Sequence, residues 1–275
     1  IRSMAVNNVF YPGEPGDLLN FIDENSPNEP ECSACALIVP HAGYKYSGKT
    51  AALAFSSLKR EFRTAIIIGP SHTMRLSGLS IAPHDAYETP FGQMEIDTDK
   101  RSKLLENPLF KDVEEAHIRE HAIEVELPFL YQINPDQRIV PIICGHLSKS
   151  ELKSAAQTIE SVCDSDTVVI ISSDFTHYGK RFNYLPFTND KASIELEKLD
   201  RSVIDTITAN DVDGLHAIIE KTGATVCGYL PIALLLEIFN SRDIQIKLCD
   251  YTNSGYISGD FETAVGYAGL SIRSL

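Results

Sequence analysis

The chain has 275 residues, of which 43% are hydrophobic and 23% are charged, and these proportions are those of a globular protein with a sizeable core. A formal net charge of −14 argues against nucleic acid and anionic lipid as partners, because both are bound through clustered Lys and Arg. We therefore expect no nucleic-acid or membrane partner, and instead a small molecule, a peptide or a protein.

The N-terminal residues and the cysteines indicate the compartment. The first residues lack the apolar core of a signal peptide, and the longest apolar run, at residues 229–236, is too short to cross a bilayer. Six cysteines scattered over this length do not resemble a disulfide framework. Cys32 and Cys35 have the spacing of a redox or zinc pair, but no second such pair follows. We interpret them as two incidental thiols, with a disulfide as the alternative, and predict a cytoplasmic protein.

Short β-rich runs alternate with helical patterns after a polar stretch, residues 23–31, that predicts an exposed loop. Strands are predicted at residues 36–39, 64–68, 138–144, 167–172, 245–250 and 263–272. Helices are predicted at residues 48–58, 120–132, 149–162, 192–207, 212–221 and 231–239, and a hairpin-like pair of strands at residues 79–82 and 93–96. No repeat or linker divides the sequence. We therefore predict a single α/β domain over residues 1–275, with a central, mostly parallel or mixed sheet flanked by helices.

Four predicted strands end in short turns that carry a histidine: His41, His72, His146 and His177. In open α/β sheets the ligand crevice lies beyond the carboxyl ends of the strands, so these side chains are expected to converge. Several imidazoles near a thiol or carboxylate are typical of a transition-metal site, and they equally supply an acid or base that titrates near neutral pH. A single strand-end histidine is more often a hydrogen-bonded turn residue, but four in series favour function for at least two. His146 is the weakest candidate because it leads directly into a helix start.

The remaining histidines are less informative. His84 and His117 lie in polar loops, which predicts solvent exposure, and His216 lies within an amphipathic helix, which predicts a structural role. His121 and Glu124 are one helical turn apart, a spacing that suits a pocket wall and a solvated surface equally well. The sequence lacks the second histidine of an HExxH zinc-protease motif.

Cys227 directly precedes an apolar helix, where the helix dipole favours a thiolate. A nucleophile, a metal ligand and a packed small hydrophobic residue all fit this position, and the local sequence alone favours packing. Glycine-rich phosphate motifs and the GxSxG elbow are absent, which argues against nucleotide binding and an α/β-type serine hydrolase.

Read in order, the motifs resemble those of the Memo family, the homologues of the mediator of cell motility. They are FYP at residues 10–12, PHAGY at 40–44, GPSH at 69–72, YETP at 87–90, EHAIE at 120–124, SSDFTHYG at 172–179 and CG at 227–228. The resemblance covers nearly the full length and implies a fold similar to that of class III extradiol dioxygenases. Those enzymes hold non-haem Fe(II) with two histidines and one carboxylate.

The resemblance also implies roles for individual residues. It places the two metal-ligand histidines at His41 and His72, and the third ligand position at Cys227. The acid/base histidine of the dioxygenases corresponds to His177, with Asp174 beside it, while His146 falls outside the family pattern. A thiolate in place of the carboxylate softens the site toward copper(I), zinc or differently tuned iron, so ring cleavage is not carried over.

Three functional hypotheses follow. The first is a metal-dependent redox protein with iron or copper at His41, His72 and Cys227, His177 as proton shuttle and Asp174 orienting it. In this hypothesis three further side chains are candidate pocket residues, namely Tyr44, Tyr46 and His121. The second is hydrolytic, with zinc at the same ligands activating water. The third is a non-catalytic pocket that binds a peptide or a partner protein.

Overall fold

A computed structural model describes residues 1–28 and 33–275, so Cys32, and with it the interpretation of Cys32 and Cys35 as two incidental thiols, lies outside the described residues. The described chain contains a nine-stranded sheet in the order β10-β11-β1-β8-β2-β7-β3-β6, with β9 paired to β11. The central neighbours β1–β8, β8–β2 and β2–β7 are parallel, and β11 and β3 run antiparallel to β1 and β7. The predicted α/β fold with a mixed sheet flanked by helices is therefore confirmed.

The four central strands are buried runs rich in Ile and Val. They are β1 (Ala36–Val39), β2 (Thr64–Pro70), β7 (Arg138–Cys144) and β8 (Thr167–Ser172). Successive side chains of a strand point to opposite faces, so Ile38 joins one apolar layer and its neighbours Leu37 and Val39 join the other. Helices cover both faces, which explains why these strands are continuously apolar instead of alternating.

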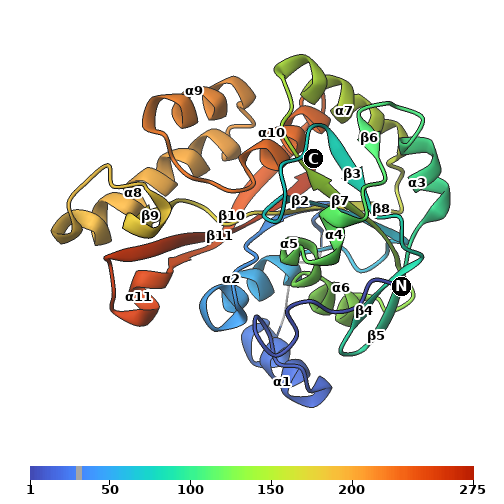
Figure 1. The fold of residues 1–275 in the computed structure, drawn as a ribbon, viewed down its shortest axis with the longest axis horizontal. Coiled ribbons are helices and arrows are strands. Elements are labelled where there is room, and N and C mark those ends of the chain that lie inside the picture. The colour runs from blue at the N-terminus through green and yellow to red at the C-terminus, as the bar shows by residue number, and fades with distance from the viewer. Residues whose placement is uncertain (29–32) are drawn as a thin grey trace.

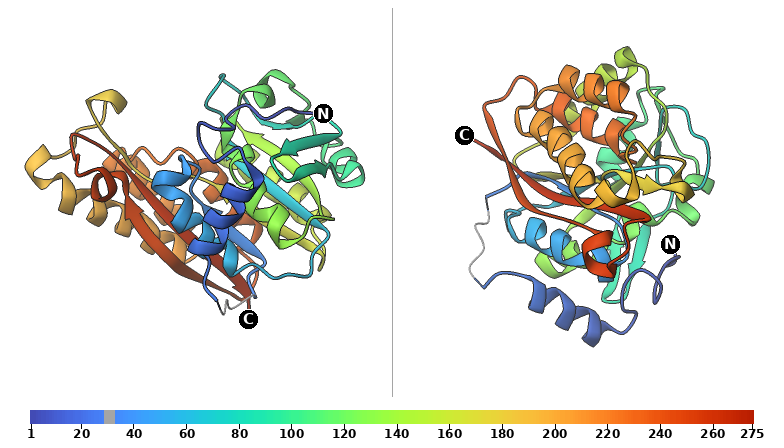
Figure 2. Two further views of the ribbon diagram at one scale, coloured as in Figure 1. Left: turned by 90° about the horizontal axis from the view of Figure 1, so that it is seen from below. Right: turned by 90° about the vertical axis from the view of Figure 1, so that its left-hand side faces the viewer.

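Two groups of helices form these layers, above and below the sheet in Figure 1. One layer contains α7 (Lys149–Val162), α8 (Asn189–Thr208), α9 (Val212–Thr222) and α10 (Tyr229–Ile238). The other contains α1 (Pro15–Asn25), α2 (Tyr44–Ser56), α5 (His121–Glu124) and α6 (Leu127–Ile133). In the right-hand view of Figure 2, α9 and α10 lie on one side of the long strand β11, and α1 and α2 lie on the other.

The remaining elements extend the sheet or connect it. Strands at its margins are β3 (Leu79–Ile81), β6 (Phe110–Lys111), β9 (His177–Gly179), β10 (Ile244–Asn253) and β11 (Thr263–Ser274). A separate hairpin is formed by β4 (Ala86–Thr89) and β5 (Gly92–Glu95). Short helices are α3 (Thr98–Leu104), α4 (Glu115–Ile118), η1 (Lys180–Phe182) and α11 (Ser254–Ser258).

Several predicted elements were misplaced. The hairpin exists, but its first strand is β4, because residues 79–81 instead pair with β6 and β7 in the main sheet. The helix predicted at residues 120–132 is broken into α5 and α6, since Pro128 has no N–H to continue a helix and instead lies in the first turn of α6. The loop predicted at residues 23–31 is wrong for residues 23–25, which end α1.

Among the described residues, no helix combines the length and apolar character needed to cross a membrane.

Candidate metal centre

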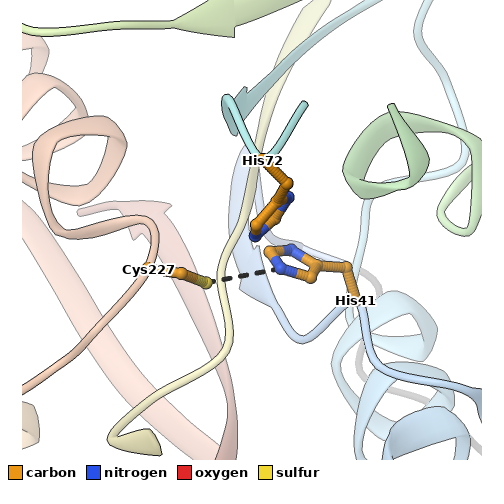
Figure 3. Close-up of side chains that lie close together, drawn as sticks. All are labelled: His41, His72 and Cys227. Carbon is orange, nitrogen blue, oxygen red and sulfur yellow. Dashed lines mark hydrogen bonds between the residues drawn. The ribbon is translucent and has the colours of Figure 1, made fainter. Parts of the chain in front are cut away.

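Three adjacent parallel strands, in the order β1-β8-β2, bring the candidate residues to one edge of the sheet. His41 lies two positions after the end of β1, His72 two after β2, and Asp174 two after β8. Cys227 reaches the same edge from the loop between α9 and α10. Figure 3 shows the rings of His41 and His72 and the thiol of Cys227 pointing toward one another.

The three side chains are close enough to share one ion. One ligand atom from each of His41, His72 and Cys227 lies within 4.8 Å of the other two. The Cys227 Sγ lies 3.3 Å from His41 Nε2. The resemblance placed these three residues together, and the fold brings them together from three separate segments of the chain.

The ring of His41 is oriented from the interior of the protein. Its Nδ1 lies 2.8 Å from the hydroxyl of Ser172, the last residue of β8, and this contact leaves Nε2 facing Cys227. Burial, reinforced by the neighbouring imidazoles of His72 and His121, holds the pKa of His41 well below its usual value. His41 is therefore neutral at physiological pH, which is the state that binds metals.

His72 is oriented by a carboxylate. Glu120 accepts hydrogen bonds from the backbone N–H of His72 at 2.6 Å and from its Nδ1 at 2.8 Å. The same side chain caps α5 by accepting from the N–H groups of His121 and Ala122. Burial raises the pKa of Glu120, but the hydrogen bonds and charge of His72 outweigh it, so the pKa lies below its ordinary value. Because Nδ1 is occupied, Nε2 of His72 is the nitrogen left to bind a ligand.

His121 completes a cluster of three imidazoles. Its ring lies 4.5 Å from that of His72 and 5.3 Å from that of His41, measured between centroids, and Phe10 packs on it at 4.8 Å. Burial and the nearby His72 lower the pKa of His121 to about 4. The sequence left open whether His121 lies on a pocket wall or on a solvated surface. In the structure it lies beside the other two histidines.

Asp174 and Cys227 contribute a carboxyl group and a thiol to the site. Asp174 Oδ1 accepts from the backbone N–H of His41 at 2.9 Å, and its Oδ2 lies 4.0 Å from His41 Nε2. The backbone N–H of Asp174 lies 3.3 Å from the Cys227 sulfur and is oriented to donate to it. Burial raises the pKa of both side chains, and the charge of Asp174 raises that of the Cys227 thiol further. A bound cation would reverse this preference, because it favours the thiolate.

His177 lies at the start of β9, beside these groups. Its Nδ1 lies 2.9 Å from the carbonyl of Phe175 and 3.0 Å from that of Thr225, so Nδ1 carries the hydrogen and Nε2 is the free acceptor. Its positive charge, when present, opposes the burial-driven rise in the pKa of Asp174. The charge on His177 thus favours the ionised form of Asp174.

The two tyrosines are located differently. Tyr44 is buried in the layer of α1, α2 and α6, where its ring stacks on Phe129 and its hydroxyl donates to the carbonyl of Val125. The hydrogen of the Tyr44 hydroxyl is therefore already donated within the protein. Tyr46 is half-buried, and together with Tyr44 it lines a cavity of about 410 Å³ between α2 and β10.

The structure corrects the prediction for His117, which is buried instead of exposed. Its Nδ1 lies 2.9 Å from the hydroxyl of Tyr87 and its Nε2 3.0 Å from that of Ser80, and burial lowers the pKa of His117 to about 3. His84 is also mostly covered, with 11% of its side chain exposed. His146, in contrast, is exposed and does not join the cluster.

The comparison with protein families decides the assignment: the family described as Memo-like protein matches residues 2–271. The chain belongs to the Memo family. Its relatives include MEMO1 family proteins of Thermoplasma volcanium, 35% identical over 98% of this chain and 97% of that protein, and of Methanothermobacter thermautotrophicus, 36% identical over 98% and 100%. A further MEMO1 family protein, from Archaeoglobus fulgidus, is 35% identical over 99% of this chain and 100% of that protein.

A solved structure of an uncharacterized protein from Escherichia coli K12 has a similar fold. It covers 87% of this Memo-family chain and 99% of its own length, with a TM-score of 0.57 and 14% identity. At this identity the likeness concerns the fold alone.

Residues that support the cluster were not identified from the sequence. Glu120 directly precedes the candidate His121, and Ser172 is the last residue of a predicted strand. These positions were the available signals for a supporting role. Glu124 anchors the N-terminal segment, because it forms a buried ion pair with Arg2 and accepts from the N–H groups of Ala5 and Val6. No local pattern identifies that role.

Proposed function

We propose that this Memo-family chain is a metal-dependent redox protein that holds iron or copper through His41, His72 and Cys227. The observation that carries the proposal is the convergence of two imidazoles and a thiol, with ligand atoms within 4.8 Å of one another, at the carboxyl edge of the sheet.

The donor set fits a transition metal. Metal–nitrogen distances of about 2.0 Å and metal–sulfur distances of about 2.3 Å put tetrahedral N and S ligands roughly 3.5 Å apart. The separation of 3.3 Å between His41 Nε2 and Cys227 Sγ agrees with this value. Thiolate with imidazole suits copper, iron and zinc, and not the hard cations Mg²⁺ and Ca²⁺.

In this proposal, bound iron or copper supplies the one-electron chemistry, and the chain's own residues manage protons and orientation. His177 accepts or releases a proton at Nε2, because its Nδ1 is committed to backbone carbonyls. Asp174 holds the backbone of His41 and tunes the charge beside His177. His121, whose ring lies beside those of His41 and His72, would contact the substrate. Tyr44 and Tyr46 would line the neighbouring cavity between α2 and β10.

The proposed ligand is a small molecule, with a peptide or protein partner as the non-catalytic alternative. The acidic net charge of −14 favours neither nucleic acid nor anionic lipid. A reducing cytoplasm would keep the Cys227 thiol available as a ligand.

The test is anaerobic purification of untagged protein with metal quantification, followed by O₂-consumption assays with small phenols and thiols. His41→Ala is the site variant, and His146→Ala, which alters an exposed histidine outside the cluster, is the matched control. Iron or copper bound to the wild type and control, but lost from His41→Ala, supports the proposal. Zinc with turnover indifferent to O₂ indicates hydrolytic use of the same ligands. No metal above background in any sample overturns the proposal.

A further inference from the structure

A third carboxyl group, besides those of Glu120 and Asp174, lies behind the cluster in the core. Glu126, between α5 and α6, has no exposed surface. Its Oε1 lies 2.9 Å from the hydroxyl of Ser172, which in turn contacts the Nδ1 of His41. Its other oxygen, Oε2, is buried and has no hydrogen-bond partner among the described residues. Within residues 1–28 and 33–275, no lysine or arginine forms an ion pair with it.

The hydrogen bonds at Ser172 determine where the protons lie. The Ser172 oxygen has three polar neighbours: the carbonyl of Ala122 at 2.6 Å, Nδ1 of His41 at 2.8 Å and Oε1 of Glu126 at 2.9 Å. A hydroxyl donates one hydrogen and accepts two. The carbonyl of Ala122 can only accept, so it takes the single hydrogen of Ser172. Both other neighbours must then donate to the Ser172 oxygen.

This arrangement requires a hydrogen on Glu126. If Glu126 were ionised, it would compete with the Ala122 carbonyl for the single hydrogen of Ser172. One of these two oxygens would then lie closer than 3 Å to the Ser172 oxygen with no hydrogen between them. An isolated ionised carboxylate in the core also carries a large desolvation cost, and here one of its oxygens would be unpaired.

We propose that Glu126 is a positioning residue, a neutral carboxylic acid that donates to Ser172 and so leaves the Ser172 hydrogen on the Ala122 carbonyl. Ser172 then accepts from His41, whose tautomer has hydrogen on Nδ1 and leaves Nε2 free. The inference rests on the proposed function only in treating Nε2 as the metal-binding atom. The protonation of Glu126 and the tautomer of His41 are properties of the metal-free protein.

The electrostatic surroundings agree with a neutral Glu126. Burial holds the pKa of Glu126 well above its ordinary value, and the nearby carboxylate of Asp174 raises it further, against the opposing hydrogen bond with Ser172. The other titratable group that couples to Glu126 is the phenol of Tyr44, whose own pKa is raised by burial and then by Glu126. Both neighbours are acids, so neither offers a positive charge that would stabilise the ionised form.

The two ligand histidines are therefore held by different kinds of carboxyl group. Glu120 accepts a hydrogen bond directly from His72, which increases the basicity of that imidazole. Glu126 reaches His41 through a hydroxyl and adds no negative charge. We expect His72 to be the stronger electron donor of the pair.

Glu126→Gln is the conservative variant, because an amide is neutral and can donate an N–H to Ser172. Glu126→Met removes the donor at similar volume. In zinc competition titrations with a chelator, Glu126→Gln should bind within about threefold of wild type. Glu126→Met should weaken binding about tenfold, because it removes a donor from Ser172, the residue that holds the ring of His41.

Two spectroscopic readouts on metal-free protein do not depend on metal binding. The infrared difference between wild type and Glu126→Gln at neutral pH should contain the carbonyl band of a protonated carboxylic acid. Nitrogen NMR of His41 should report hydrogen on Nδ1. A carboxylate band in place of the acid band, or hydrogen on Nε2, overturns the inference, and so does unchanged zinc affinity in a folded Glu126→Met.

The outcomes separate the two proposals. An acid band and an Nδ1–H tautomer in a wild type that binds no metal sustain this inference while the proposed function fails. Metal binding by a wild type whose Glu126 is ionised overturns this inference and leaves the proposed function standing. If Glu126→Met does not fold, the infrared and NMR measurements on wild type and Glu126→Gln decide alone.

Discussion

The sulfur of Cys227 lies 3.3 Å from Nε2 of His41, although 186 positions separate the two residues in the sequence. One follows the first strand of the sheet, and the other precedes α10. An isolated β-bridge between Thr176 and Val226 holds the Cys227 loop against the segment after β8. Strand β8 pairs with β1, the strand that carries His41 at its end. The position of the thiol beside the imidazole therefore depends on β8.

Replacing the thiol should remove the distinctive ligand. We expect Cys227→Ser to weaken Co²⁺ binding and to abolish the thiolate-to-metal charge-transfer absorption, because an alcohol oxygen is a poor substitute for thiolate at a soft site. Spectroscopic titration with Co²⁺ measures both effects. Cys249→Ser, at a half-exposed cysteine on β10, is the matched control and should behave as wild type. An unchanged absorption in Cys227→Ser would show that sulfur is not a ligand.

Glu120→Gln should reduce metal affinity by about 10- to 100-fold, because the carboxylate orients His72 through two hydrogen bonds. Competition with a chelator measures the change. Asp211→Asn makes the same carboxylate-to-amide change at the N-cap of another helix, α9, and serves as control for that change at a helix cap. Equal affinities for the two variants would assign Glu120 to capping alone.

Glu124→Ala should destabilise the fold by about 3–5 kcal/mol, because it leaves the buried guanidinium of Arg2 without its carboxylate partner. It also removes the acceptor for the Tyr11 hydroxyl and the N–H groups of Ala5 and Val6. Urea unfolding measures the loss in the free energy of unfolding. Lys149→Ala breaks an exposed ion pair with Asp213 and should cost less than about 1 kcal/mol. Similar losses for both variants would contradict the anchoring role.

Asp200 should make stability fall as pH rises. It is buried beneath the segment that carries His177, where it accepts from the N–H of Thr176 at 3.0 Å and from the hydroxyl of Tyr251 at 2.9 Å. Burial raises its pKa to about 7. Between the unfolded value near 3.8 and pH 7, the folded state binds more protons than the unfolded state, so stability decreases across that window.

Asp200→Asn removes this titration at similar size. The unfolding free energy of the variant relative to wild type should rise by roughly 3 kcal/mol between pH 5 and pH 8. Paired urea titrations at the two pH values give this difference directly. A constant difference would mean that Asp200 is ionised in the folded state throughout the range.

The sequence by itself determined the central sheet. Strands at residues 36–39, 138–144 and 167–172 and the helix at 149–162 have the predicted bounds, because long apolar runs and a Ser-x-x-Glu capping box at Ser148 are local signals. It also determined the family and the candidate ligands, since their motifs are contiguous. Local signals failed where tertiary contacts decide. Residues 79–81 pair with β7, and His117 is buried, because the neighbours that satisfy them are distant in sequence.

Only the tertiary structure decided which strand-end histidines converge. His41 and His72 follow β1 and β2, which flank β8, whereas His146 follows β7 and is exposed. Cys227 illustrates the same division: its local sequence favoured a packed thiol, and its resemblance to the family indicated a ligand. The sheet order and the Thr176–Val226 bridge bring it within 3.3 Å of His41, and no spacing along the chain encodes that distance.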